Sequence, residues 1–390
     1  MSQSKNDAMK NYHINQKPKI LVVYHYFAQY RFPVIRELLQ SDRFSYCFAA
    51  DREAQSPELK VLEETDIPVE AFVSLKNVWL KKRFLWQKGL CRLLSCEEYD
   101  AVIFLGDAQF ISTWLGAIIA RMRGKTIVMW THGGRRHETG AKGRIRQLFY
   151  SLADGLMVYG KRGQDLLIKA GKAAGRVTVI YNSLDYDRQK ALRDKSSSRS
   201  DLRRARSIPV DSLVVIWVGR IVPGRNLDLL FSAAAHISCH RELRILIVGD
   251  GGEKERFMRR AQDLGISQNV SWIGAIHEEE KLAPLFRSAD VCVSAGPIGL
   301  LAIHALAYGI PVVTHDDFDI QKPEAEAIIP GETGAFFCKG DAFDLARKIE
   351  GVASELPISV EQRCIDIVER NYTPCRQRVL IEEALLKWMK

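Results

Sequence analysis

The sequence has no apolar run that could cross a bilayer. The longest stretch without Asp, Glu, Lys or Arg spans residues 291–315 and contains three glycines and two prolines. Glycine and proline at this density interrupt regular structure, so the stretch indicates a strand, a loop, a helix and a second strand rather than a membrane span. At the N-terminus, no positively charged segment is followed by an apolar run and a cleavage site of small residues, so we also expect no signal peptide.

The eight cysteines lack the spacing of a metal or redox site. No pair is separated by two residues, and none stands beside histidines at ligand spacing. Cys292 lies in an apolar run, where a free thiol packs as a small hydrophobic group. We therefore expect a reducing compartment, which is the cytoplasm, and no metal.

No dinucleotide-binding Gly-x-Gly-x-x-Gly pattern follows the first expected strand, Ile20–Tyr24. This absence argues against a nicotinamide or flavin oxidoreductase. The Gly249–Gly252 turn lacks the Lys-Ser/Thr pair of a P-loop, which argues against that class of nucleotide hydrolase.

Positive charge is concentrated in one half of the chain. Residues 1–185 carry 28 basic and 18 acidic side chains, a net +10, whereas the remainder carries 28 and 29, a net −1. Such asymmetry predicts an anionic partner for the first half, either an anionic lipid surface or a phosphorylated substrate. No nucleic-acid module signature is present, so we expect no nucleic acid.

The segment Lys76–Arg92 is basic and contains no acidic residue. On a helical wheel Lys81 and Lys88 share one face, whereas Trp79 and Trp86 share the opposite face. With Lys82, these residues predict an acceptor or membrane face on an interfacial helix. A surface helix that packs its tryptophans on a sheet fits the same pattern.

Short apolar runs alternate with helical patterns along the whole chain, which predicts an α/β protein with two Rossmann-like parallel-sheet domains facing an interdomain cleft. We expect a flexible tail at 1–18, a first Rossmann-like domain at 19–186, a serine-rich charged linker at 187–208, a second Rossmann-like domain at 209–373, and a terminal helix at 374–390. Ligands of such sheets bind beyond the carboxyl ends of the strands.

Three loops of the second half combine glycine with a following helix. Gly219 and Arg220 end one expected strand, and Arg225 stands just before the next helix. The Gly249–Gly252 turn and the Ser294–Gly299 loop follow two later strands. Glycine allows close backbone approach, helix N-termini offer free N–H groups, and arginine pairs with phosphate. Each loop alone is equally an ordinary βα turn, but their convergence on one sheet edge favours a diphosphate site.

The second half resembles the large family 4 glycosyltransferases, which have the GT-B fold. The matching segments run in the family's order and are VGRIVPGRNLDLL, ILIVGDGGEKERF, VSWIGAI, LFRSADVCVS, ALAYGIPVVT and EAIIPGETGAFF. The first half matches more weakly, through VVYHYFAQYRFPVIRELL, WTHGG and VIYNSLD. The resemblance implies a nucleotide-diphosphate sugar as co-substrate and no other cofactor.

By this resemblance, Arg220 and Arg225 correspond to the basic pair that holds the donor diphosphate, together with Gly219, Gly299 and Leu300. Arginine at 225 replaces the usual lysine and adds a planar fork of donors.

Ile273 and Gly274 resemble the loop that contacts the nucleobase, and His132 resembles the residue that reaches the reacting sugar. A neutral imidazole there can hydrogen-bond a hydroxyl or help move a proton. A structural histidine at a strand end is the alternative for His132.

The chain departs from the family at its usual Glu-x(7)-Glu pair. The alignment places Gly296 at the first glutamate, which normally holds the donor sugar, and His304 at the second, which normally holds the ribose. Glu326, before the GETG turn, is a possible donor-sugar or loop residue but cannot simply replace the pair.

We therefore expect a metal-independent, retaining glycosyltransferase acting on a saccharide or lipid-linked saccharide in polysaccharide or lipopolysaccharide synthesis. We expect it in the cytoplasm, with the cytoplasmic face of the membrane as a peripheral docking surface. The alternatives are a sugar-nucleotide-binding scaffold without turnover and a GT-B sugar-nucleotide epimerase.

Overall fold

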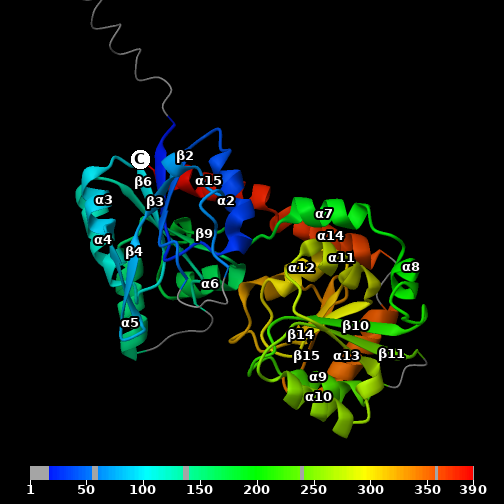
Figure 1. Cartoon of the computed structure of the whole chain (residues 1–390). Helices are drawn as coiled ribbons and strands as arrows, with labels where there is room; N and C mark the ends of the chain where they lie inside the picture. The colour runs from blue at the N-terminus through cyan, green and yellow to red at the C-terminus, as the bar shows by residue number, and fades with distance from the viewer. Residues whose placement is uncertain (1–16, 55–59, 135–139, 238–240, 356–358, 390) are drawn as a thin grey trace, which may run out of the picture.

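The computed structural model describes residues 17–54, 60–134, 140–237, 241–355 and 359–389, which form two α/β halves (Figure 1). The first half contains a parallel sheet of seven strands in the order β3-β2-β1-β6-β7-β8-β9. These strands are β1 (Lys19–Val23), β2 (Ser45–Ala50), β3 (Phe72–Ser74), β6 (Ala101–Leu105), β7 (Thr126–Thr131), β8 (Gly155–Val158) and β9 (Val177–Val179). The almost uninterrupted burial of the central strands β6 and β7 is typical of parallel strands that are covered on both faces.

Helices pack on both faces of this sheet. They are α2 (Phe32–Leu39), α3 (Leu90–Cys96), α4 (Ile111–Met122), α5 (Gly140–Ser151) and α6 (Lys161–Lys169). The last helix, α15 (Pro374–Trp388), returns to this half and packs on α2, β8 and β9 (Figure 1). Trp388 Nε1 donates to Gly175 O at 3.0 Å and anchors its end. In the described part of the chain, no helix combines the length and apolar character needed to cross a membrane.

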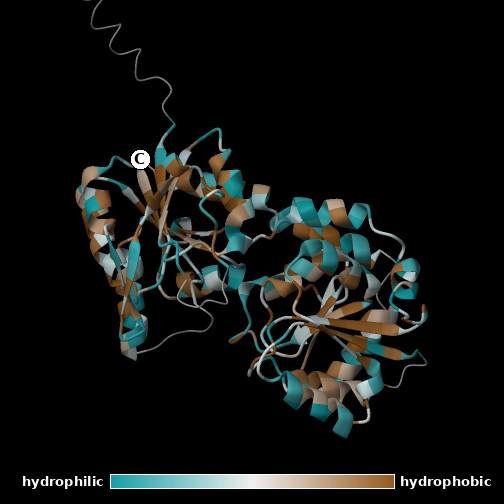
Figure 2. Cartoon of the chain, in the orientation of Figure 1, coloured by the Kyte–Doolittle hydropathy of each residue, from teal (hydrophilic) through white to brown (hydrophobic). Residues whose placement is uncertain are grey.

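The second half contains a parallel sheet of six strands in the order β12-β11-β10-β13-β14-β15. The strands are β10 (Leu213–Val218), β11 (Leu243–Val248), β12 (Val270–Gly274), β13 (Val291–Ser294), β14 (Val312–His315) and β15 (Gly334–Phe337). Figure 2 shows brown strands lying between helices that carry teal outer surfaces. The two-sheet α/β fold class predicted from the sequence is confirmed.

Each face of the second sheet has its own hydrophobic core. Helices α7 (Tyr186–Asp194), α11 (Glu279–Ser288), α12 (Leu301–Ala307) and α14 (Val360–Asn371) cover one face. Helices α9 (Leu227–Ala234), α10 (Lys254–Asp263) and α13 (Ala342–Glu355) lie toward the other (Figure 1). The loops that follow the strands are therefore left at the sheet edge.

The helix predicted over residues 76–92 is wrong, because most of this segment is a β-hairpin. Strand β4 (Lys76–Leu80) pairs antiparallel with β5 (Phe84–Lys88). Trp79 lies opposite Leu85 and Trp86 lies opposite Val78, so the two tryptophans point to opposite faces of the hairpin.

Tertiary hydrogen bonds explain why the hairpin prevails over the helical pattern. Gln87 Nε2 donates to Tyr24 O at 2.9 Å, and Asn77 Nδ2 donates to His25 O at 2.7 Å. These amides attach one hairpin face to the end of β1. Lys81 and Lys82 occupy the turn with φ of 50° and 53°, well away from Lys88 at the other end of β5.

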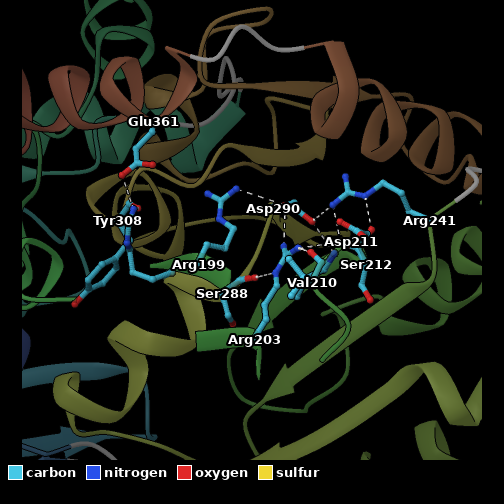
Figure 3. Close-up of polar contacts among 12 residues, drawn as sticks. Arg199, Arg203, Val210, Asp211, Ser212, Arg241, Ser288, Asp290, Tyr308 and Glu361 are labelled. Carbon is cyan, nitrogen blue, oxygen red and sulfur yellow. Dashed lines mark hydrogen bonds and ion pairs between the residues drawn. The ribbon is translucent and has the colours of Figure 1, made fainter. Parts of the chain in front are cut away.

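Residues 187–208, expected as a linker, are folded onto the second half. Helix α8 (Arg199–Arg204) packs against α11. Arg203 is buried, donates to Ser288 O at 2.9 Å and pairs with Asp290 at 2.9 Å, as Figure 3 shows. Asp290 also pairs with Arg199 and Arg241. Part of the charge that suggested a solvated linker therefore anchors this segment. The tail expected at 1–18 lies mostly outside the described residues.

Candidate functional site

The glycine loops at the carboxyl edge of the second sheet lie against one another. Ile221 N donates to Asp250 O at 2.8 Å, which joins the loops after β10 and β11. A Cβ atom at Gly249 would lie 1.8 Å from Gly219 O, so only glycine allows this approach. Asn226 Nδ2 donates to Ala295 O at 3.3 Å, which adds the loop after β13. The predicted convergence of the three loops is therefore present.

Arg220 and Arg225 lie near each other in the loop after β10. Arg220 is exposed and Arg225 is half-buried. Burial lowers the pKa of Arg225, and the positive charge of Arg220 lowers it further. Two neighbouring guanidinium groups repel each other, and an anion bound between them relieves this repulsion. Gly219 directly follows β10 and precedes Arg220, and it has no side chain to cover the backbone at the end of the strand.

The loop before α12 is held by a segment that the sequence did not single out. Ile298 N donates to Gln321 Oε1 at 2.8 Å, and Lys322 N donates to Ile298 O at 3.2 Å. Gly299 and Leu300 follow directly, with the Lys322 side chain beside Gly299. Hydrogen bonds with residues 321–322 thus hold the loop before α12, which is the predicted diphosphate loop.

Gly296 occupies a buried position with no room for a side chain. A Cβ atom there would lie 2.6 Å from Gly224 O and 3.1 Å from Arg225 O. A carboxylate at this position, as in the resembling family, is incompatible with this backbone arrangement. Where the family has its first glutamate, this chain therefore has close packing between the loop after β13 and the loop after β10.

The expected nucleobase and ribose residues lie at the neighbouring strand and helix. Ile273 is exposed at the end of β12, and Gly274 O accepts from Gly249 N at 2.8 Å. His304 Nε2 lies 2.8 Å from Glu279 Oε1, which also accepts from the Tyr308 hydroxyl at 2.6 Å. A carboxylate therefore stands beside the His304 ring, supplied by α11 rather than by α12.

His132 follows β7 on the opposite side, in the first half. Its ring lies 4.7 Å from the Tyr159 ring, and it is exposed. His132 lines a cavity of about 980 Å³, to which the second half contributes Asp319 and Ile320. It also lines a smaller pocket with Arg162, Lys322 and Glu326. His132 is thus placed where the two halves meet.

Glu326 links the two halves through the N-terminus of α6. Its carboxylate accepts from Lys161 N at 2.7 Å and from Arg162 N at 2.8 Å. Burial raises the pKa of this carboxyl, while these two N–H groups oppose the shift. Both oxygens are thus bound to backbone in this arrangement, which favours a domain-linking role over contact with a donor sugar.

The hairpin residues take different places from those expected on a helix. Trp79 and Lys82 line the large cavity, and the Trp79 ring lies 6.1 Å from the Phe110 ring. Lys81 is exposed at the turn, and Lys88 is exposed at the far end of β5. Trp86 is half-buried on the other face, so no single surface unites the predicted group.

Sequence reasoning missed several residues at the junction of the halves. Arg31 and Tyr159 line the large cavity, Asn182 Nδ2 donates to buried Glu324 Oε1 at 2.8 Å, and Gln321 pins the α12 loop. They belong to different elements and share no local motif. Two of them lie in segments of the first half that match the family weakly, Arg31 in VVYHYFAQYRFPVIRELL and Asn182 in VIYNSLD, whereas Tyr159 and Gln321 lie in no matching segment.

Comparison with known proteins agrees with this geometry. Residues 198–365 match the family model described as Glycosyl transferases group 1. The second half is a group 1 glycosyltransferase domain. D-inositol 3-phosphate glycosyltransferase 2 of Catenulispora acidiphila is 28% identical over 205 residues, or 49% of this chain and 46% of that relative. The chain thus matches less than half the length of this relative.

Solved structures match nearly the whole chain. The apo form of the lipopolysaccharide outer core galactosyltransferase WaaB superposes with a TM-score of 0.70 at 18% identity, covering 94% of this chain and 99% of that one. HepE of Anabaena in complex with UDP superposes with a TM-score of 0.71 at 19% identity, covering 95% and 100%. Together with the sheet topology, these neighbours show that the chain has the GT-B fold, and the family resemblance read from the sequence is confirmed.

Proposed function

We propose that this protein is a glycosyltransferase that moves a sugar from a nucleotide diphosphate to a hydroxyl of a saccharide or lipid-linked saccharide. The observation that carries the proposal is the pair Arg220 and Arg225, set among converging glycine loops in a group 1 domain. The names of the relatives and neighbours support it, since they include inositol phosphate glycosyltransferases, a lipopolysaccharide galactosyltransferase and a UDP complex. Cell-surface polysaccharide or lipopolysaccharide synthesis is the setting that we propose.

In the proposed reaction, the bond between the anomeric carbon and the β-phosphate oxygen breaks, and a bond to the acceptor oxygen forms. The acceptor proton passes to the departing diphosphate, and the anomeric configuration is retained. Arg220 and Arg225 stabilise the negative charge that builds on the leaving group, which is the role that we assign to them in place of a metal. His132, on the facing wall, orients the reacting sugar through its imidazole.

A transfer assay tests this proposal. The full chain is incubated with UDP-, GDP-, ADP- and dTDP-sugars, with and without saccharide acceptors, and nucleotide release is followed. We expect release with one donor class, and a loss of about 100- to 1,000-fold in Arg220→Gln. Arg256→Gln is the matched control, because Arg256 is an exposed arginine that pairs with Asp228. Equal rates in the wild type and Arg220→Gln contradict the assignment of the site.

A non-catalytic sugar-nucleotide scaffold is the second candidate. Gly296 and His304 favour it, because neither supplies the carboxylate that the resembling family uses. The same assay separates the candidates: a scaffold binds a nucleotide sugar in an Arg220-dependent manner and releases no nucleotide.

We also propose that the acceptor is presented at an anionic membrane surface. The hairpin turn carries Lys81 and Lys82, and α4 exposes an apolar stripe at helical spacing, at 40–82% exposure: Ile111, Leu115, Ile118 and Met122. Apolar side chains beside lysines suit an interface with anionic lipid. This stripe takes the place of the Trp79 and Trp86 pair on which the sequence prediction depended.

Vesicle pelleting tests the membrane proposal. We expect binding to phosphatidylglycerol vesicles that falls several-fold in Leu115→Glu/Ile118→Glu and in Lys81→Glu/Lys82→Glu. Binding to neutral phosphatidylcholine should stay low throughout. Met258→Glu is the control, since Met258 is an exposed apolar residue of the second half. Unchanged pelleting of both double variants contradicts the proposal.

A further inference from the structure

Arg31 presents a positive charge inside the first half, and no carboxylate of the described residues pairs with it. It ends the short 3-10 helix Gln29–Arg31, before α2. Its guanidinium lies 5.0 Å from the Tyr24 ring centre, 5.4 Å from Trp130 and 5.7 Å from Tyr159. It donates to the Tyr159 hydroxyl at 2.5 Å. Over the residues that the structure describes, no Asp or Glu pairs with it.

A guanidinium has five N–H donors, and one such hydrogen bond leaves most of them for another acceptor. Aromatic rings hold the group by cation–π contact, but they do not neutralise it. A cation in this setting costs free energy unless an anion joins it. The charge of the buried Glu324 carboxyl reaches Arg31, but the described residues show no ion pair between the two, and Glu324 Oε1 accepts from Asn182 Nδ2 instead.

The cavity that Arg31 lines has an excess of positive charge. Lys82, Arg83 and Arg146 line it together with Arg31, against Asp107 and Asp319. Asp319 pairs with Arg162 at 2.5 Å, outside this group. His25, on the same wall, stays neutral because burial and the Arg31 charge lower its pKa to about 4.

The cavity walls also suit a sugar ring. Tyr26, Tyr30, Trp79 and Phe110 line it, and its volume of about 980 Å³ falls in the range of sites that enclose small organic ligands. Aromatic faces pack against the apolar faces of pyranose rings, whereas the polar edges of a sugar need donors and acceptors. The combination of rings with an unbalanced guanidinium suits a saccharide that carries an anionic group.

We propose that this cavity binds the acceptor and that Arg31 binds an oxyanion on it, so the acceptor is a phosphorylated or carboxylated saccharide. The inference rests on the proposed glycosyl transfer and names the acceptor class for that reaction. Phosphate and carboxylate share the paired oxygens that match the guanidinium fork. His132 lines the same cavity, so the bound acceptor lies beside the residue proposed to face the donor sugar.

Calorimetric titration of the full chain tests the inference. Glucose 1-phosphate, glucuronate and glucose are the probes, and whichever of UDP, GDP, ADP and dTDP the wild type prefers is held at saturation so that the probes cannot occupy the donor site. We expect at least one anionic probe to bind about tenfold or more tightly than glucose, and its identity distinguishes phosphate from carboxylate. Arg31→Gln removes this preference, and Arg31→Lys, which keeps the charge but loses the fork, retains part of it.

Arg52→Gln is the matched control, because Arg52 lies 4.1 Å above the Phe72 ring, also in the first half and outside the cavity lining. Its affinities should equal those of the wild type. No anionic preference in the wild type, or a preference that persists in folded Arg31→Gln and Arg31→Lys, overturns the inference. If Arg31→Gln does not fold, the inference is tested by the preference of the wild type for an anionic probe and by whether Arg31→Lys reduces that preference.

Arg220→Gln keeps the two proposals apart. It should bind the preferred nucleotide diphosphate more weakly and still bind the anionic probe, whereas Arg31→Gln should lose the probe and still bind that diphosphate. Failure of UDP, GDP, ADP and dTDP alike to bind the wild type removes the proposed function and leaves Arg31-dependent probe binding to be judged by itself.

Discussion

The two walls of the interdomain junction are built in different ways. On the second half, Arg220 and Arg225 stand five residues apart in one loop, and neighbouring turns bring glycine backbone against it. On the first half, Arg31, His132 and Tyr159 come from three elements that are distant in sequence. The site on the second half is thus built from local backbone turns, whereas the site on the first half depends on tertiary assembly. If the first is the donor wall and the second the acceptor wall, as we propose, changes on the donor wall should affect nucleotide binding, and changes on the acceptor wall should affect turnover and acceptor binding.

Among the changes that test this comparison of the two walls, His132 should have the largest effect. We expect His132→Asn to lower the transfer rate by about 100-fold or more while the affinity for the nucleotide diphosphate stays within about twofold, since the proposed role of the imidazole is toward the reacting sugar and not the diphosphate. Steady-state kinetics and calorimetric titration measure the two quantities. His236→Asn is the control, because His236 is exposed and stacks on Phe343 on the second half. A parallel loss of nucleotide affinity in His132→Asn contradicts the division between the two walls.

The packing of the donor loops can be tested at Gly296. A methyl group there meets Gly224 O at 2.6 Å, so Gly296→Ala should lower the free energy of unfolding by about 1–3 kcal/mol and weaken nucleotide binding. Gly252→Ala is the matched control, since no atom lies within 4 Å of its added Cβ, and we expect a change of less than about 0.5 kcal/mol. Urea unfolding measures both. Equal stabilities of the two variants contradict the close approach of the loops.

A smaller effect should come from Glu324, which lies at the contact between the walls. Burial raises the pKa of its carboxyl above the ordinary value of 4.5. Since the folded pKa exceeds the unfolded one, the contribution of this group to stability is complete below the unfolded pKa and falls as the pH rises through the folded pKa. Glu324→Gln should therefore match the wild type near pH 4 and melt slightly higher at pH 7, because Oε1 can still accept from Asn182.

Thermal melting across this pH range measures the difference. Glu53→Gln is the control, because the Glu53 side chain is 79% exposed. If the melting temperature of the wild type instead rises relative to that of Glu324→Gln as the pH rises, the sign is reversed and the raised pKa of the buried carboxyl is contradicted.

Much of the fold was predictable because parallel strands appear as short apolar runs. Ala101–Leu105 and Leu213–Val218 are runs of this kind, and both are buried along nearly their whole length. The hairpin at residues 76–88 was not predictable, because each of its two faces carries apolar or aromatic side chains, and their spacing along the sequence also fits a helix. Hydrogen bonds from Gln87 and Asn77 to the end of β1 decide between the two structures, and no local pattern contains them.

The candidate site divides in the same way. Arg220, Arg225 and the glycine loops were predictable, since their motif is contiguous. The role of Arg31 was not predictable, because it is inferred from the fact that no described carboxylate pairs with this guanidinium, and only the assembled half shows this. The missing carboxylate at Gly296 likewise has its physical reason in a loop about seventy residues earlier in the chain.

Nucleotide affinity tests the central claim, that Arg220 and Arg225 hold the donor diphosphate, most directly. Titration of the wild type with UDP, GDP, ADP and dTDP identifies the preferred base, and the matching monophosphate is then compared with that diphosphate. We predict that the wild type prefers the diphosphate by about tenfold or more, and that Arg220→Gln/Arg225→Gln abolishes this preference while monophosphate affinity changes little. A double variant that still prefers the diphosphate, or a wild type that does not distinguish the two, contradicts the account.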